Sequence, residues 1–323
     1  MMKKAIVTGA TGFIGRWLVR ELLRENISVT AVIRPDSPNR RFLPENDELQ
    51  VAECRMDSYH TLPEQISRQK ECVFYHLAWA GVSGSDRIDL KVQLDNVYAS
   101  GEAVKAASAI GCDAFIGLGS IMEEEAAAVT DGDKIKPGLG YIYGEAKQFS
   151  HLLTKALAVE YHIAHMWPVL TNAYGEYESS PRFINTTLRK IIYHEPLEFT
   201  AGTQMYDFIH VKDAVRALIA IGRRGGAFQR YLVGSGYAAP LRTFIERIGK
   251  TLAPQSNLNF GKVPFTGVSL PIERFDIDAL IKDTGFVPQI PFEDGIRRTM
   301  DWIEKSERMK PAGKEMEVKL KYE

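Results

Sequence analysis

The sequence is poor in cysteine. Its 323 residues include three cysteines, Cys54, Cys72 and Cys112, which are far apart along the chain. The number is odd, and no CxxC or Cys/His spacing typical of metal sites is present. We therefore predict no disulfide framework and no metal site, and the cysteine usage fits a reducing, cytoplasmic environment.

The sequence also lacks an excess of charge and a long apolar run. The formal net charge is -1, so no broad basic field is available to bind nucleic acid or an anionic membrane. No run approaches the roughly 18 apolar residues that a membrane span needs. The apolar stretch after Lys3 and Lys4 is interrupted by glycines and Arg16, which does not suit a signal peptide.

What remains is the composition of an ordinary globular enzyme, 45% hydrophobic and 25% charged. Short β-branched runs alternate with helical patterns in the first half. "AIVTG", "SVTAVIR", "CVFYHLAW" and "DAFIGLGS" read as strands, and "GRWLVRELLREN" has helical spacing. This alternation predicts an α/β fold whose doubly wound parallel sheet, of the Rossmann type, has helices on both faces.

The pattern becomes less regular after residue 170. We predict a dinucleotide-binding domain over 1–170 and a smaller mixed α/β substrate domain over 171–307, followed by a charged tail over 308–323. The second domain is expected to be discontinuous, because "RYLVGSG", near 228–236, still reads as a strand of the main sheet.

Three glycines, Gly9, Gly12 and Gly15, lie between the first strand and the first helix. Such a run in a βαβ unit is typical of a dinucleotide site. Gly9 permits the tight turn, Gly12 lets the backbone approach a pyrophosphate, and Gly15 lets helix and strand pack closely. The unpaired N–H groups at the helix N-terminus favour the anion.

The residue after the second strand discriminates between cofactors. An acidic residue there binds the ribose of NAD, whereas arginine accommodates the 2′-phosphate of NADP. The position holds Arg34, with Arg40 and Arg41 in the following loop. Asp36, two residues after Arg34, keeps open the alternative that an acidic residue binds the ribose. The prediction is NADP(H), with NAD(H) as the alternative.

The middle of the chain carries a candidate proton donor. Tyr143 and Lys147 are four residues apart in a helical stretch and therefore share a face. A nearby ammonium lowers the pKa of a phenol, and Ser120, at a strand end, could hydrogen-bond the same substrate oxygen. An ordinary helix surface is the alternative interpretation of the Tyr–Lys spacing.

In combination, these motifs resemble the extended short-chain dehydrogenase/reductase family, the nucleotide-sugar epimerase, dehydratase and reductase group. The likeness covers roughly residues 4–304 and rests on "TGATGFIG", "YHLAW", Asn96, "YGEAK", "TNAYG", "YDFIHVKD" and "YLVGSG". The resemblance implies Ser120, Tyr143 and Lys147 as the catalytic residues. It implies a cofactor site of Gly9, Thr11, Gly12, Phe13, Ile14, Gly15, Arg34, Asp57, Leu77, Ala78, Trp79, Asn96, Tyr143 and Lys147. The implied substrate residues are Trp79, Met122, Asn172, Arg182 and Tyr206.

The residues after Ser120 narrow the reaction. Family dehydratases carry an Asp-Glu pair there, and the fucose-synthase type carries a cysteine, but this chain has Ile121 and Met122. The resemblance then favours a 4-keto-6-deoxysugar reductase that uses NADPH. A nucleotide-sugar 4-epimerase with tightly bound NAD is the alternative. Many members carry arginines where this chain has Tyr206 and Val169, which keeps reduction of a non-nucleotide ketone or aldehyde open.

Four further expectations concern the rest of the molecule. Arg182 or Arg274 could bind the substrate phosphate. The run from Glu123 to Glu125 is expected to be a solvated loop, with Glu123 as a possible second acid, and His76 to be a packed core histidine. The resemblance also implies a homodimer built on two helices of each subunit. These are the helix that contains Val97, Tyr98, Gly101 and Val104 and the helix that begins at Tyr143.

Overall fold

The computed structural model describes residues 2–130 and 138–308. Its main sheet is parallel and has the order β3-β2-β1-β4-β5-β7-β12, with β6 paired to β7. The strands are β1 (Lys4–Thr8), β2 (Ser28–Ile33), β3 (Leu49–Glu53), β4 (Cys72–His76), β5 (Ala114–Gly117), β6 (Gly119–Ser120), β7 (Ala164–Leu170) and β12 (Arg230–Val233). The predicted α/β class with a parallel sheet is confirmed.

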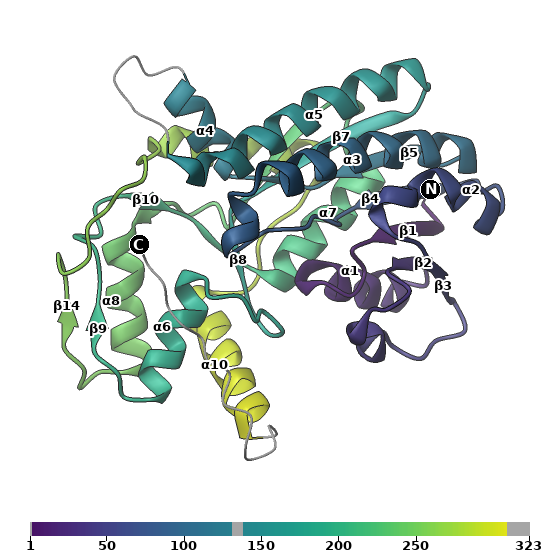
Figure 1. Ribbon diagram of the computed structural model, residues 1–323. Coiled ribbons are helices and arrows are strands. Elements are labelled where there is room, and N and C mark those ends of the chain that lie inside the picture. Colours follow the sequence, from purple (N-terminus) through teal and green to yellow (C-terminus); the bar gives the residue numbers. More distant parts are fainter. Residues whose placement is uncertain (1, 131–137, 309–323) are drawn as a thin grey trace.

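Helices cover both faces of this sheet (Figure 1). Helices α3 (Leu90–Ile110) and α5 (Ile142–Glu160) pack together on one face, and α1 (Phe13–Arg24) and α7 (Val211–Arg224) pack together on the other. Successive residues of a strand point to opposite faces. In β1, Ala5 and Val7 belong to the core under α1 and α7, whereas Ile6 belongs to the core under α3. Burial on both faces explains why the strands are continuously apolar.

The predicted strand near 228–236 is confirmed, because β12 pairs with β7 in parallel. Helices α7 and α9 (Asp278–Thr284), from the second half of the chain, also belong to the layers around the main sheet. They pack on each other, and α9 also packs against β12. Both helices lie within the 171–307 region that the sequence analysis assigned to the substrate domain. The domain boundaries themselves stay a prediction.

Most of the elements from β8 onward form a second layer around an aromatic core. Its helices are α6 (Phe183–Ile192), α8 (Leu241–Leu252) and α10 (Phe292–Arg308). Its strand pairs are β8 (Asn172–Tyr174) with β11 (Phe208–His210), β9 (Leu197–Glu198) with β14 (Leu258–Asn259), and β10 (Met205–Tyr206) with β13 (Ala239–Pro240). Phe208 lies 5.0 Å from Phe244 and 5.9 Å from Phe292 between ring centroids. Of the charged tail predicted from 308, all residues after Arg308 lie outside the described residues.

Two cysteines that are remote in sequence meet in the fold. The sulfur atoms of Cys72 and Cys112 are 3.6 Å apart, because β4 and the segment before β5 run side by side. Both are buried free thiols, as is Cys54. The wide separation of these two cysteines along the chain therefore did not reveal that they meet in the fold.

The outer surface of α3 and α5 carries exposed apolar side chains. On α3 these are Leu94 and Tyr98, and on α5 they are Phe149 and Leu152. Of the four residues by which the sequence analysis identified α3, Val97, Gly101 and Val104 are buried in the protein itself, whereas Tyr98 is exposed. In the described parts of the chain, no helix is long and apolar enough to cross a membrane.

Candidate active site

The glycine loop lies against the carboxyl end of β4. Gly9 has a φ of 66°, and a Cβ there would lie 2.8 Å from the Ala78 nitrogen. A Cβ on Gly15 would lie 2.1 Å from the Gly9 carbonyl oxygen. Each position therefore requires glycine, for a left-handed turn and for close packing of helix on strand. This matches the roles that the sequence gave to these two glycines.

The first turn of α1 has the features of a pyrophosphate cradle. Gly12 is its N-cap, no side chain caps the helix, and the first turn contains no acidic residue. Four backbone N–H groups at a helix start lack intrahelical partners, and an anion satisfies them. The Thr11 hydroxyl lies 3.3 Å from that of Ser37, which ties the glycine loop to the loop after β2. These residues fit a dinucleotide.

The loop after β2 presents Arg34 to solvent, directly beyond the last strand residue. Asp36 lies 3.9 Å from the Arg55 guanidinium, and Arg40 forms an ion pair with Glu53. Part of the charge in this region is therefore already paired. Asp57 is exposed at the start of a 3-10 turn and accepts a hydrogen bond from the Ser58 hydroxyl at 2.8 Å.

Helix α3 braces the segment after β4. The Asn96 side chain accepts a hydrogen bond from the Ala80 N–H at 2.8 Å and donates one to its carbonyl oxygen at 2.9 Å. The Trp79 indole N–H donates to Gln93 at 2.8 Å.

His76 is buried, and its ring nitrogens lie 2.9 Å from the Thr8 hydroxyl and 3.1 Å from the Ser100 hydroxyl. His76 is thus a packed core histidine.

Ser120, Tyr143 and Lys147 come together above the carboxyl ends of β5 and β7. Ser120 ends β6, while Tyr143 and Lys147 lie in the first two turns of α5, 8% and 5% exposed. The Lys147 amine donates to the Leu118 carbonyl oxygen at 2.7 Å. It also lies 3.6 Å from the centroid of the Trp79 ring and 6.0 Å from that of Tyr143.

Burial dominates the ionisation of this cluster. It raises the pKa of Tyr143, and the charge of Arg182 is the largest opposing influence, ahead of contact with Ser120 and the charge of Arg87. The sequence had assigned this opposing charge to Lys147. Burial lowers the pKa of Lys147 to about 7, opposed by the charge of Glu123. The arginines of the pocket therefore add to the electrostatics of the candidate proton donor.

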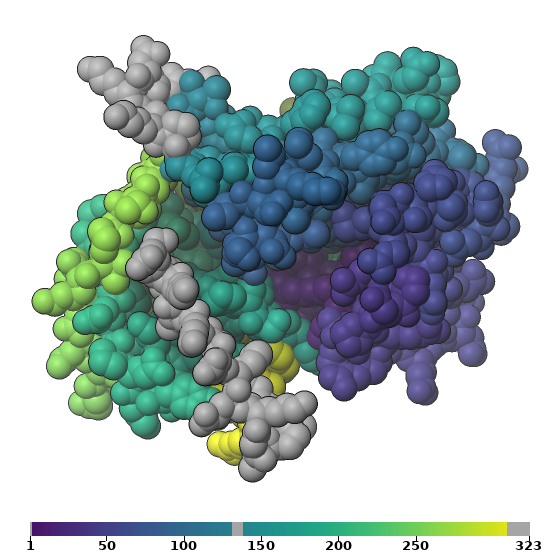
Figure 2. Space-filling model, viewed as in Figure 1, coloured from purple at the N-terminus to yellow at the C-terminus, as the bar shows by residue number. Residues whose placement is uncertain are grey.

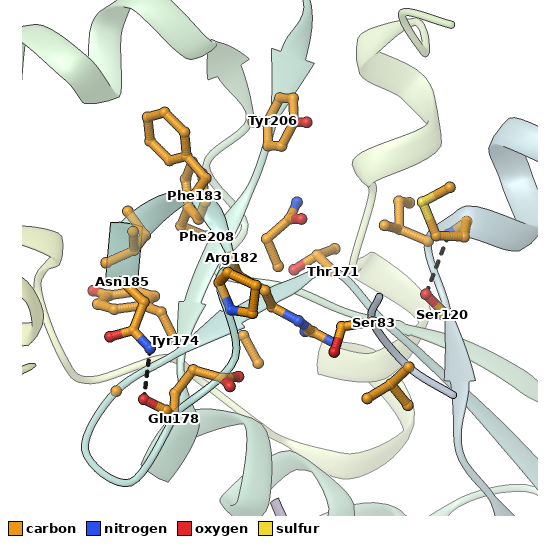
Figure 3. Close-up of a pocket in the computed structure, with 18 of the residues that line it drawn as sticks. Ser83, Ser120, Thr171, Tyr174, Glu178, Arg182, Phe183, Asn185, Tyr206 and Phe208 are labelled. Atoms are coloured by element: carbon orange, nitrogen blue, oxygen red, sulfur yellow. Dashed lines mark hydrogen bonds between the residues drawn. The ribbon is translucent and has the colours of Figure 1, made fainter. Parts of the chain in front are cut away.

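Ser120 and Tyr143 line a cavity of about 520 Å³ between the main sheet and the second layer. Figure 2 shows the surface hollowed between these parts. In Figure 3 Ser120 lies at one end, with Tyr206, Asn185 and Glu178 across from it. Four of the five predicted substrate residues line the cavity: Met122, Asn172, Arg182 and Tyr206. Trp79 does not line it; its ring contacts Tyr143 instead, with centroids 6.1 Å apart.

The sequence analysis missed three charged lining residues, Arg87, Glu125 and Glu178. The Arg87 guanidinium lies 5.1 Å from the Tyr143 ring centroid, and its buried Nε has no hydrogen-bond partner among the described residues. Burial raises the pKa of Glu125 to about 7, and the charge of Arg87 opposes that rise. Arg87 was detectable in principle, because it follows β4 at the carboxyl edge where α/β sheets bind ligands.

The acidic run is not a solvated loop. Glu123 and Glu124 are 3% and 8% exposed in helix α4 (Met122–Thr130). Glu124 forms ion pairs with Arg230 and, at 2.7 Å, with Arg274. Arg274 is thereby held in that pair and does not line the cavity, so Arg182 remains of the two predicted phosphate ligands.

Comparison with known proteins identifies the chain's relatives. Residues 5–234 match the sequence profile of the NAD dependent epimerase/dehydratase family. The chain belongs to this family. It is an NAD(P)-dependent enzyme of the extended short-chain dehydrogenase/reductase type, as its motifs indicated.

Individual relatives of this family member carry out different reactions. This chain is 25% identical to the dTDP-4-dehydro-6-deoxyglucose reductase of Escherichia coli, over 92% of this chain and 96% of that protein. It is 23% identical to the CDP-abequose synthase of Salmonella muenchen, over 94% and 98%. The UDP-N-acetylglucosamine 4-epimerase of Methanobrevibacter ruminantium M1, solved with UDP-N-acetylmuramic acid, superposes with a TM-score of 0.78 at 22% identity, over 94% and 99%. That superposition supports the fold alone.

Proposed function

We propose that this enzyme reduces a keto group on a nucleotide-activated deoxysugar with NADPH. The observation that carries the proposal is that Ser120 and Tyr143 line a large cavity together with Arg87 and Arg182, while Lys147 lies one helical turn from Tyr143 in α5. Proton transfer to a carbonyl requires a donor at the cavity, and recognition of a diphosphate requires cations there.

The residues have distinct roles in this proposal. The glycine loop and α1 would hold the pyrophosphate, Arg34 the 2′-phosphate and Lys147 the nicotinamide ribose. When bound, NADPH supplies the hydride for the carbonyl carbon. Tyr143 donates its proton to the carbonyl oxygen, and the Ser120 hydroxyl orients that oxygen by hydrogen bonding.

The substrate class rests on the cavity and on the relatives. The helix α6 starts at Arg182 without a side-chain cap, so its free N–H groups and the guanidinium face the same space. Arg87 adds a second cation to the lining of the cavity. The reductase and the synthase among the relatives carry nucleotide-sugar names. A nucleoside-diphosphate sugar with a 4-keto-6-deoxyhexose is therefore the preferred substrate.

Reduction is favoured over epimerisation by Arg34, which suits the consumed cofactor NADPH. The test mixes purified enzyme with NADPH and a nucleoside-diphosphate 4-keto-6-deoxyhexose and follows absorbance at the NADPH band. Stoichiometric loss of NADPH with formation of an alcohol supports the proposal. Interconversion of sugar isomers without NADPH consumption would establish the epimerase instead.

A thermal-shift screen addresses the substrate class independently. A ligand at 100 times its dissociation constant stabilises the fold by roughly 2.7 kcal/mol, which is readily detected. Nucleoside diphosphates should raise the melting temperature beyond the effect of NADP(H) alone. A response to simple ketones or aldehydes but to no nucleotide would favour a reductase of non-nucleotide substrates.

A further inference from the structure

The loop between β8 and α6 contributes a carboxylate to the cavity, and half of that carboxylate has no partner. Glu178 is 6% exposed and lines the cavity. Its Oε1 atom accepts two hydrogen bonds from Ser180, from the backbone N–H at 2.8 Å and from the hydroxyl at 2.6 Å. Its Oε2 atom has no hydrogen bond or ion pair with any of the described residues. Because a buried acceptor without a donor is costly, Oε2 has a place for a ligand group.

Hydrogen bonds from two helices hold this loop in place. The Asn185 side chain, in α6, donates to the Glu178 carbonyl oxygen at 2.6 Å and to the Ser180 carbonyl oxygen at 3.0 Å. The Trp17 indole, in α1, donates to the Glu176 carbonyl oxygen at 3.0 Å. Figure 3 shows the Asn185 bond on one side of Glu178 and the carboxylate on the other side, pointing into the cavity. The carboxylate is therefore positioned before any ligand binds, which lowers the entropic cost of binding.

The arginines of the cavity do not neutralise this carboxylate. Arg182 and Arg87 line the same cavity, but in the described part of the chain neither forms an ion pair with Glu178. The guanidinium groups thus remain available for phosphate, and the carboxylate remains available for a second kind of group. A carboxylate accepts hydrogen bonds and donates none, so the ligand group that meets Oε2 must carry an O–H or N–H.

The order of the residues along the cavity identifies that group. In Figure 3, Ser120 and Glu178 lie at opposite ends of the cavity, and the guanidinium of Arg182 lies between them. The proposed function places the reacting sugar at Ser120 and the diphosphate at the arginines. In a nucleoside-diphosphate sugar, the group beyond the diphosphate is the ribose, whose hydroxyls are donors. Acidic side chains bind a ribose 2′-hydroxyl in the same way in NAD sites.

We propose that Glu178 binds the 2′-hydroxyl of the substrate's ribose and makes the enzyme selective for ribonucleoside over 2′-deoxyribonucleoside diphosphate sugars. The proposal rests on the proposed function for the placement of the sugar and the diphosphate. When a 2′-deoxy nucleotide fills the cavity, the ligand excludes water from Oε2 and offers it no donor. Loss of a hydrogen bond to a charged group then weakens binding roughly 10–100-fold.

The experiment compares matched nucleotides by titration calorimetry. The wild type is titrated with UDP, CDP and GDP and with the 2′-deoxy form of each. The dinucleotide site is first saturated with whichever of NADP⁺ and NAD⁺ binds more tightly, so that the nucleotides do not occupy it. For the base that binds best, the ribonucleotide should bind about 10–100-fold more tightly than its 2′-deoxy form. The two members of a pair share base and phosphates, so the ratio of dissociation constants measures the effect of the hydroxyl alone.

Two variants of the loop assign the ratio to a residue. Glu178→Gln keeps an oxygen for Ser180 but replaces Oε2 by an amide nitrogen, which cannot accept. The ratio should fall about threefold or more, through weaker binding of the ribonucleotide. Glu176→Gln is the matched control, two residues earlier in the same loop. The Glu176 carboxylate lies 3.1 Å from His210 and 3.3 Å from Lys212 and does not line the cavity, so this variant should keep the wild-type ratio.

The outcomes separate this proposal from the proposed function. Equal affinity of the wild type for ribonucleotide and 2′-deoxy forms would overturn the role of Glu178 and leave the nucleotide-sugar class intact. An unchanged ratio in Glu178→Gln, or an equal fall in both variants, would also overturn it. If no nucleoside diphosphate binds, this proposal and the proposed substrate class are both wrong. If Glu178→Gln does not fold, Glu178→Asp, which withdraws the carboxylate by one methylene, should show the same fall.

Discussion

The Lys147 amine lies over the face of the Trp79 ring, 3.6 Å from its centroid. Trp79 in turn meets the Tyr143 ring edge-to-face, with the planes at 80°. The tryptophan thus orders the lysine and the tyrosine together, although it does not line the substrate cavity. Such packing fixes a long flexible side chain where its charge is used, and it makes the Tyr143–Lys147 pair the first target for mutation.

Removing only the phenol hydroxyl tests the proton donor. Tyr143→Phe keeps the ring and its contact with Trp79, so the fold and NADPH affinity should be retained. Turnover of the keto sugar should fall 10²–10⁴-fold, or about 3–5 kcal/mol in activation free energy. Steady-state kinetics and cofactor titration measure both quantities. Undiminished turnover in Tyr143→Phe would remove the mechanism.

Lys147→Met should impair cofactor binding and turnover together, because the amine serves the ribose and the tyrosine. The double variant Tyr143→Phe/Lys147→Met should be little slower than the worse single variant, since both act on one proton transfer. Full additivity of the two activation free energies would show that the residues act in separate steps.

Much of the fold was predictable from sequence, and the errors have identifiable causes. Strands β1, β2, β4 and β5 are continuous apolar runs, and they were found. Strand β3 was missed because it reads "LQVAE", with three of its five residues exposed at the sheet edge. A 3-10 turn (Pro38–Phe42), rather than an α-helix, lies between β2 and β3. The alternation of strand and helix patterns that located the other strands is therefore absent there.

In the site, a residue's role could be predicted only where it depends on segments that are adjacent in sequence. Gly9 and Gly15 were predictable, because their roles depend on a strand and a helix adjacent in sequence. The burial of Glu123 was not, because its partner Trp167 is 44 residues away. The position of Arg87 after β4 was detectable from the sequence, but its contact with the Tyr143 ring was not, because the two residues are far apart along the chain.

Cofactor preference provides the second prediction. Arg34 is exposed directly after β2, where a guanidinium can bind the 2′-phosphate. Arg34→Asp should narrow or reverse the preference for NADPH over NADH, measured as the ratio of dissociation constants. Arg24→Asp makes the same charge change at the far end of α1 and should leave the ratio unaltered. Tighter binding of NADH than NADPH by the wild type would refute the assignment of Arg34.

The arginines of the cavity provide the third. Arg87→Met keeps the length of the side chain but removes the guanidinium. Loss of a charged hydrogen bond costs roughly 1.5–3 kcal/mol, so KM for the nucleotide sugar should rise about 10–100-fold. Arg274→Met is the control, because that arginine pairs with Glu124 away from the cavity. A KM increase shared equally by both variants would argue against Arg87 as a substrate ligand.

Assembly provides the fourth. The apolar side chains of Leu94, Tyr98, Phe149 and Leu152 are 49–67% exposed on α3 and α5. A second copy that packs its own α3 and α5 against them would bury this surface in a four-helix bundle. We expect a dimer by light scattering at micromolar concentration, and a monomer for Leu152→Glu. Val287, also exposed at 58%, lies elsewhere, and Val287→Glu should remain dimeric.

The last prediction concerns stability and pH. His76 is fully enclosed between Thr8 and Ser100, and burial lowers its pKa to about 3. In the unfolded chain a histidine titrates near pH 6.5. At pH values between about 3 and 6.5, His76 binds a proton in the unfolded chain but not in the native protein. Lowering the pH in this range therefore favours unfolding. The stabilising contribution is complete above about pH 6.5 and decreases as the pH falls toward 3.

Urea unfolding at pH 7.5 and 5.5 measures this contribution. Wild type should lose about 1 kcal/mol of unfolding free energy through His76 over that interval, in addition to losses at His151 and His165, whose pKa values are also lowered by burial. His76→Asn should be less stable at pH 7.5, because it alters a buried hydrogen-bonded site, yet lose less between the two pH values. His60 is exposed, and His60→Asn should reproduce the wild-type difference. If His76→Asn shows the same pH dependence as His60→Asn, then His76 takes up a proton in the folded state, and its place as a neutral core residue is wrong.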